Sequence, residues 1–429
     1  MKKTMRILCL ALCFVMLASV MVACKSTDSP AGSTGAAGGQ KYTLTIWGAE
    51  KDQAMLKEMC AAYAAANPQN EYKFLFGVQE ENDTADKVLN DVTTGPDIFS
   101  FPSDQLARLY AGGALARIGG DIEKNLKEVN SAESIDAATL TIGGEDQLYA
   151  YPSTADNCYF VYYDKRVYTN ADDLSSLDKM LAAAEAAGKE VHFKLNNDGW
   201  YLSSFFFANP ELKYEVTYDD RMQETKVDIN YDSAAGLEVM KSLQHYIGSG
   251  NLVATTDDSK ITAAVTEEKA AAVITGIWNA KTLQDLLGDN LGVCKLPTAN
   301  IGGSEVQLSG YMGYKLIGVN GYSQNKGEAH KLAQWLTNEQ NQLKRYEVRG
   351  FRPTNKNADA SQAVVKDPIL AAIREQAQFN RTQKGVPNGY WTPMASLVTP
   401  LVTAQTEGKE ITEEQLQEFL DALCASVRK

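Results

Sequence analysis

Segments with the alternating pattern of β-strands and segments with helical spacing follow one another along the chain from Lys41 onward. Tyr42 to Trp47 alternates β-branched, aromatic and aliphatic residues, whereas Met55 to Tyr63 carries apolar residues at helical spacing until Asn67-Pro68. Further strands are expected at 72–78, 98–101, 159–163, 270–274 and 314–319, and further helices at 86–92, 104–110, 177–187, 234–246, 328–337 and 412–427. This order predicts an α/β fold of parallel βαβ units with an open sheet, where ligands bind beyond the carboxyl ends of the strands.

The first 23 residues read as an export signal rather than as part of the fold. A positive start with Lys2, Lys3 and Arg6 precedes an apolar run, and Met21-Val22-Ala23-Cys24 resembles the lipobox of bacterial lipoproteins. Met21 departs from the usual Leu, and a plain secretory signal is the alternative. Residues 24–40 are expected to be the lipidated Cys24 and a Ser/Gly-rich flexible tether. We therefore expect an exported protein, anchored outside a Gram-positive membrane or in the periplasm.

Composition excludes several classes of partner. The formal net charge is −13, which argues against nucleic acid because phosphate binding needs basic patches. No later stretch has the roughly 20 apolar residues that span a bilayer. The cysteines of the body match no zinc motif, and their pairing stays open. No metal or cofactor is expected, and we expect a monomer.

Five short motifs, in order along the body, are similar to the maltose-binding branch of the family 1 extracellular solute-binding proteins. They are Leu44-Thr45-Ile46-Trp47, Gly95-Pro96-Asp97-Ile98, Tyr149-Ala150-Tyr151-Pro152, Gly276-Ile277-Trp278-Asn279 and Tyr390-Trp391. The resemblance implies a two-lobed, periplasmic-binding-protein-like fold of type II with hinge crossings near 154–159, 308–316 and 350–356. It places residues 41–154 plus 309–350 in an N-terminal lobe and residues 155–308 plus 351–429 in a C-terminal lobe.

The same resemblance implies a sugar site in the cleft between the lobes. Sugars pack their C–H faces on aromatic rings and need hydrogen bonds for their hydroxyl groups, so rings and charged side chains should alternate. The positions that match the family's binding residues are Glu50, Lys51, Phe101, Asp104, Asp156, Trp200, Tyr201, Trp278 and Trp391, with Tyr311 and Arg352 at the crossings. Phe101 departs from a frequent Trp, and Asp156 is a shorter acid than expected for its position.

Each of these residues also has a plainer interpretation. Glu50 and Lys51 could be the solvated first turn of a helix, and Asp104 a helix N-cap. Tyr311 and Arg352 could brace the hinge. Trp47 and Trp335 are expected to be buried support.

The function that the resemblance implies is that of the substrate-binding lipoprotein of a carbohydrate ABC importer, which delivers a malto-oligosaccharide to the permease. Another di- or oligosaccharide, or ligand presentation to a sensor, stays open as an alternative. A glycoside hydrolase would need two carboxyl groups roughly 5–10 Å apart, and the sequence contains no recognised catalytic motif. We expect a binding protein and not an enzyme. A phosphorylated ligand is disfavoured, because few cations are expected near the cleft.

Overall fold

The computed structural model describes residues 39–428. The predicted signal sequence, Cys24 and nearly all of the tether therefore lie outside the described residues. Within the described part, no helix combines the length and the apolar character needed to cross a membrane.

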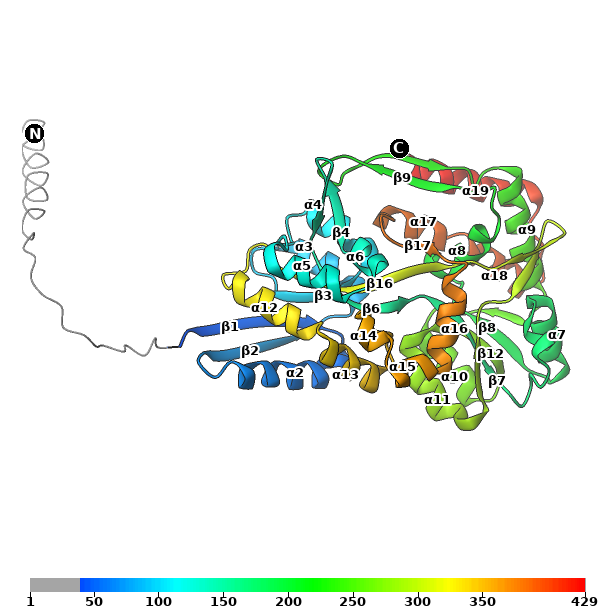
Figure 1. Cartoon of the computed structure of the whole chain (residues 1–429). Coiled ribbons are helices and arrows are strands. Elements are labelled where there is room, and N and C mark those ends of the chain that lie inside the picture. The colour runs from blue at the N-terminus through cyan, green and yellow to red at the C-terminus, as the bar shows by residue number, and fades with distance from the viewer. Residues whose placement is uncertain (1–38, 429) are drawn as a thin grey trace, which may run out of the picture. The chain divides into compact units, whose positions relative to one another are not determined.

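The first of two main sheets has six strands (Figure 1). Its order is β17-β16-β3-β1-β2, and β6 also pairs with β16. Strands β1, β2 and β3 run parallel to one another, whereas β16 is antiparallel to both β3 and β6. The bounds are β1 (Lys41–Gly48), β2 (Glu71–Val78), β3 (Ile98–Pro102), β6 (Tyr151–Asn157), β16 (Tyr311–Val319) and β17 (Arg381–Thr382).

The second main sheet has five strands in the order β11-β8-β12-β7-β13. Neighbouring residues of β7 face opposite sides, so that Tyr159 and Val161 join one core cluster while Phe160 and Tyr162 join another. A sheet covered on both faces explains why every residue of β12 is buried. The bounds are β7 (Tyr159–Asp164), β8 (Glu190–Phe193), β11 (Leu252–Ala254), β12 (Ala270–Gly276) and β13 (Leu291–Cys294).

Helices cover both sheets, and each sheet has its own apolar core. Around the first sheet lie α2 (Gln53–Ala66), α3 (Thr84–Asn90), α4 (Leu106–Ala111), α5 (Gly120–Val129), α6 (Ala132–Ala137), α12 (Lys326–Leu336) and α13 (Glu339–Arg349). Around the second lie α7 (Leu177–Ala186), α8 (Gly199–Ala208), α9 (Ala234–Gly248), α10 (Asp258–Thr266), α11 (Ala280–Leu287), α16 (Pro368–Ala377), α17 (Trp391–Ala395), α18 (Val398–Glu407) and α19 (Glu413–Val427). Two lobes, each built on one sheet, make up the fold.

The chain segments between the sheets are bonded to one another. Gly313 of β16 is paired with Asn157 at the end of β6, and Thr154 forms a bridge with Pro353. The amide of Ala155 donates to the carbonyl of Arg352 at 2.8 Å. These three segments coincide with the expected crossings.

The predicted order of strands and helices agrees with the structure, but the parallel arrangement was only half right. Both sheets are mixed, because β16 runs antiparallel to β3 and β6 in the first sheet and β7 runs antiparallel to β12 and β13 in the second. The chain reverses direction where it passes between the sheets, and repeated βαβ units cannot supply that reversal. The hairpins β4–β5 (Thr139–Ile142, Glu145–Leu148), β9–β10 (Tyr214–Tyr218, Glu224–Ile229) and β14–β15 (Thr298–Ile301, Ser304–Gln307) were not expected.

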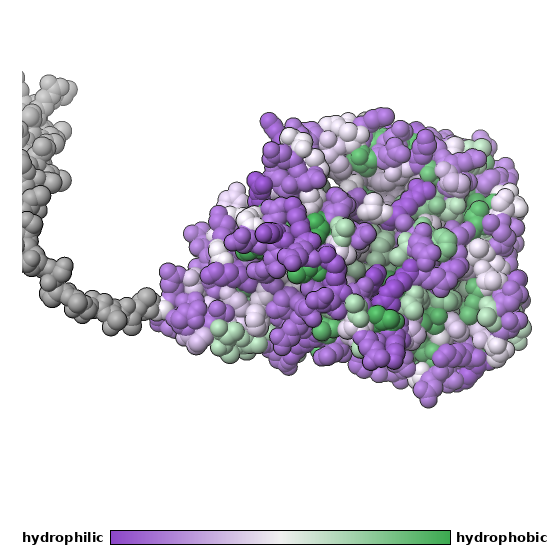
Figure 2. All heavy atoms as spheres, viewed as in Figure 1, coloured by the Kyte–Doolittle hydropathy of each residue, from purple (hydrophilic) through white to green (hydrophobic). Residues whose placement is uncertain are grey.

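Figure 2 shows a mostly hydrophilic face on which hydrophobic residues gather only in small groups. Single exposed apolar side chains of this kind are normal for a folded domain. The four cysteines of the described residues are free thiols: Cys60, Cys158, Cys294 and Cys424.

Candidate sugar-binding cleft

A cleft of about 590 Å³ lies where elements of both lobes end. The first sheet contributes Pro102 at the end of β3, Asp104 just after it, and Asp156 and Asn157 at the end of β6. From the second lobe come the first turn of α8, the residues after β12 and the first turn of α17. Ligands of α/β sheets bind at the carboxyl ends of strands, and this cleft has that position.

Three tryptophans line the cleft: Trp200, Trp278 and Trp391. The rings of Trp200 and Trp278 lie 5.9 Å apart between centroids at an angle of 40°. All three side chains are only partly buried, although each packs against a core cluster. An aromatic ring that packs against the core and is still partly exposed can offer a flat apolar face to a ligand.

The Trp278 ring has a defined position. Its Nε1 donates to Oδ2 of Asp258 at 3.1 Å. A Cβ on Gly276 would come within 2.1 Å of the ring, so only glycine leaves room for it. Trp200 lies in the first turn of α8, where the N-cap Asp198 accepts hydrogen bonds from the backbone amides of Trp200 and Tyr201.

Asp104 lies on the short turn after β3 and accepts a 2.7 Å hydrogen bond from Nε2 of Gln383. Burial raises the pKa of Asp104 to about 7, although nearby Lys315 and hydrogen bonds from Gln383 and Trp391 act in the opposite direction. Asp104 lies inside the turn Ser103–Gln105, whose N-cap is Pro102, and the N-cap of the following helix α4 is Gln105, so Asp104 is not a helix N-cap. Asp104 is therefore a cleft carboxyl that can change its protonation state near neutral pH.

Asp156 also lines the cleft but is only 2% exposed. Its Oδ2 accepts the backbone amide of Arg352 at 2.7 Å, so it ties the first crossing to the third. Burial raises its pKa to about 6, against hydrogen bonds from Thr154 and Arg352. Its contacts are those of a hinge residue whose carboxyl reaches the cleft.

Carboxylates outnumber cations in the lining, seven to three. Each cation is paired: Lys194 with Asp198 at 3.4 Å, Lys315 with Glu81 at 3.1 Å, and Arg349 with Asp52 at 2.9 Å. The acids are Asp52, Glu80, Glu81, Asp104, Asp156, Asp198 and Asp258. The cleft thus contains three cations where few were expected, and each of them is paired with an acidic side chain.

Five of the predicted binding residues do not line this cleft. Glu50 and Lys51 are exposed on a 3-10 turn, and Asp52 and Ala49 lie at the cleft instead. Phe101 is fully buried beside Phe99 in the core of the first lobe. Strand β3 continues through Phe101, so its side chain points to the same side as that of Phe99 two residues earlier.

The other two of the five are the crossing residues. Arg352 makes hydrogen bonds of 3.0 and 2.9 Å to the carboxylate of Asp359, which matches its bracing interpretation. Tyr311 is 1% exposed and packs edge-on against Phe207 with 4.7 Å between centroids. Tyr201 does line the cleft, yet it is also only 1% exposed.

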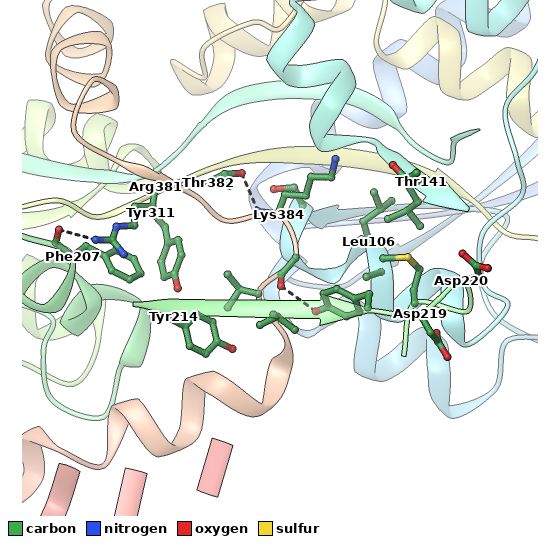
Figure 3. A pocket seen from close by; sticks show the side chains of 18 residues that line it. Leu106, Thr141, Phe207, Tyr214, Asp219, Asp220, Tyr311, Arg381, Thr382 and Lys384 are labelled. Carbon is green, nitrogen blue, oxygen red and sulfur yellow. Dashed lines mark hydrogen bonds between the residues drawn. The ribbon is translucent and has the colours of Figure 1, made fainter. Parts of the chain in front are cut away.

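Tyr311 belongs instead to a second cavity of about 520 Å³ (Figure 3). Figure 3 shows it beside Phe207 and Arg381, with Tyr214 of the β9–β10 hairpin below. The hairpin reaches the first lobe, because Tyr218 and Met222 pack against its core. This cavity is wedged between the lobes but shares none of its lining residues with the cleft.

Several cleft residues escaped the sequence prediction, above all Gln383, Lys315, Lys194 and Asp258. Asp258 has a weak local signal, since it directly follows Asp257, which caps α10. The other three lie in segments whose local pattern indicates only a strand or a loop.

Residues 58–372 match the family described as bacterial extracellular solute-binding protein, which is well over half of the chain. The chain belongs to this family. Among its relatives, the galactooligosaccharide-binding protein of Bacillus subtilis (strain 168) is 24% identical over 328 residues, 75% of each chain. The maltooligosaccharide ABC transporter solute-binding lipoprotein of Streptococcus pneumoniae serotype 4 is 24% identical over 416 residues, 91% of this chain and 90% of its own.

Solved structures agree with the fold of this solute-binding protein. A protein solved with acarbose is 29% identical, with a TM-score of 0.78 over 90% of this chain and 99% of its own. The maltodextrin-binding protein MalE1 from L. casei BL23 is 22% identical, with a TM-score of 0.74 over 91% and 99%. The two-lobed fold expected from the sequence is therefore confirmed.

Proposed function

We propose that this protein is the substrate-binding lipoprotein of a carbohydrate ABC importer and holds a malto-oligosaccharide in the cleft between its lobes. The observation that carries the proposal is the convergence of Trp200, Trp278 and Trp391 with carboxyl groups in one cleft. Rings bind the apolar faces of sugar units, while carboxyl and amide groups bind hydroxyls.

The charge of the lining supports a neutral ligand. A phosphorylated sugar would meet more carboxylates than cations, and every cation already has an acidic partner within 4 Å. Names of relatives and similar structures include maltooligosaccharide, maltodextrin, acarbose and galactooligosaccharide. Maltooligosaccharides and maltodextrins are both α-linked glucans, whereas galactooligosaccharide occurs in one of these names. We therefore favour an α-linked glucan as the ligand.

Titration calorimetry with residues 41–429, which follow the tether, tests the proposal. Maltose, maltotriose and maltotetraose are compared with a galactooligosaccharide and with a phosphorylated sugar. We expect micromolar or tighter binding of at least one maltodextrin and none of the phosphorylated sugar. Tighter binding of the galactooligosaccharide would replace the proposed ligand and keep the sugar-binding role. Absence of measurable binding to every sugar would refute that role.

We further propose binding without turnover. The family and the similar proteins are binding proteins. Four cleft carboxyls have a pKa raised by burial, and each already has a partner. Asp104 is bonded to Gln383 and Asp156 to the hinge, while Asp52 is paired with Arg349 and Asp198 with Lys194. Prolonged incubation with maltotriose should release no glucose or maltose; multiple turnovers per protein molecule would contradict this.

The expected partners follow from the same role. The lobes, with the boundaries 41–154 plus 309–350 and 155–308 plus 351–429, would close around the sugar and dock as a monomer on the permease subunits. A lipid on Cys24 would keep the protein at the outer surface of the membrane, beside that importer.

A further inference from the structure

One glutamine, which is only 4% exposed, is bonded to three groups of the cleft. Nε2 of Gln383 donates to Oδ1 of Asp104 at 2.7 Å. Its Oε1 accepts from Nδ2 of Asn157 at 2.7 Å and from Nε1 of Trp200 at 3.2 Å. These partners lie after β3, at the end of β6 and at the start of α8, so one carboxamide joins both lobes and the first crossing.

The orientation of this carboxamide is set by chemistry. An indole Nε1–H can only donate, so the oxygen of Gln383 must face Trp200. The nitrogen then faces Asp104, which is an acceptor when ionised. Every strong hydrogen-bonding position of the oxygen is used by Asn157 and Trp200.

The crossing strand has a niche for this side chain. A Cβ on Gly313 of β16 would come within 2.5 Å of Oε1 of Gln383 and 2.9 Å of Nδ2 of Asn157. The backbone amide of Gln383 also donates to the carbonyl of Met312 at 3.0 Å. The backbone and the side chain of Gln383 are thus both held against the second crossing.

We propose that Gln383 is a positioning residue, which fixes the carboxyl of Asp104 and the ring of Trp200 relative to each other and so sets the affinity of the cleft for its sugar. This inference rests on the proposed sugar-binding role. Because both partners lie in the lining of the cleft, a shift of either one changes what a ligand meets, even though Gln383 acts through them.

Three variants separate positioning from mere support of the fold. Gln383→Leu removes all three bonds, and Gly313→Ala displaces the carboxamide without removing it. Gln383→Glu keeps an oxygen that accepts from Trp200 but places a second carboxyl group beside that of Asp104. A hydrogen bond between the two carboxyl groups needs a proton on one of them, which is present only at low pH. The exposed Gln362→Glu and the open-space Gly327→Ala are matched controls.

The first readout needs no sugar. In spectra of ¹⁵N-labelled tryptophan, the indole signal of Trp200, assigned through Trp200→Phe, should shift in Gln383→Leu and Gly313→Ala and stay in place in the controls. In Gln383→Glu it should match the wild type at pH 5 and move at pH 9. Melting curves of each variant show that the fold is intact.

The second readout is affinity for maltotriose. Loss of hydrogen bonds to a charged group predicts about tenfold weaker binding or more for Gln383→Leu. For Gln383→Glu a similar loss is expected at pH 9 and little at pH 5. If the wild type binds sugar and Gln383→Leu leaves both the indole signal and the affinity unchanged, the inference is wrong. If no sugar binds at all, the proposed function fails, and an unchanged indole signal would still refute the positioning role.

Discussion

The ring of Trp278 lies directly over Gly276, where a Cβ would come within 2.1 Å of its Cη2. The φ of Gly276 is −87°, which any residue can adopt, so the glycine is needed for space and not for its backbone conformation. The rigid ring cannot move aside without breaking the bond from its Nε1 to Asp258. The position of a cleft aromatic is therefore set by the residue two places before it.

We expect Gly276→Ala to weaken maltotriose binding by about 1–3 kcal/mol, the range for loss of a well-placed aromatic contact. The change should also alter the tryptophan fluorescence, because the ring must leave its position. Gly327→Ala, in α12 with open space around it, is the control. Unchanged binding by Gly276→Ala would mean that the ring position does not matter for the ligand.

Trp278→Ala and Trp391→Ala should each weaken sugar binding by about 1–3 kcal/mol, since each removes one stacking surface. Calorimetry at one temperature measures both. Trp335→Phe is the matched control, because Trp335 packs against the core of the first lobe and donates to the carbonyl of Met59. If neither cleft variant changes the affinity while the wild type binds, the site is assigned to the wrong residues.

Asp104 predicts a dependence of stability on pH. Burial raises the folded-state pKa of Asp104 to about 7, whereas the carboxyl of an unfolded Asp titrates near its ordinary pKa of 3.8. Between those values the unfolded chain gives up its proton first, so the folded state loses stability as pH rises. Asp104→Asn does not titrate, and its stability relative to the wild type should rise between pH 4 and pH 8, by about 4 kcal/mol.

Urea unfolding at the two pH values measures this difference. Asp121→Asn, an exposed acid on α5, controls for the loss of a surface charge. A difference between Asp104→Asn and wild type that is the same at both pH values would show that burial does not raise this pKa.

Lipid attachment at Cys24 is tested in a bacterial host that processes lipoproteins. The wild-type protein should be found in the membrane fraction with the mass of a diacylglycerol-modified cysteine, because the fatty chains partition into the bilayer. Cys24→Ser should be released or retain its signal sequence. An unmodified wild-type N-terminus would refute the anchor and leave the cleft predictions unaffected.

Local pattern was sufficient for some cleft residues. Trp278 follows a buried strand that ends at Gly276, and Trp391 begins a short helix, so their places at element ends could be read from the chain. Glu50 and Lys51 show the limit of such readings. A single 3-10 turn rotates successive side chains by about a third of a turn, and it is Asp52 that reaches the cleft.

The amino-acid sequence by itself determined the succession of strands and helices, because strand alternation and helical spacing are local properties of neighbouring residues. It also placed the tryptophans at the ends of their elements. Only the tertiary structure decided that Gln383, which follows β17, would meet Asp104, a residue 279 positions earlier that follows β3 of the same sheet. That contact depends on the reversal of direction at the crossings and on the space left by Gly313, which no local pattern encodes.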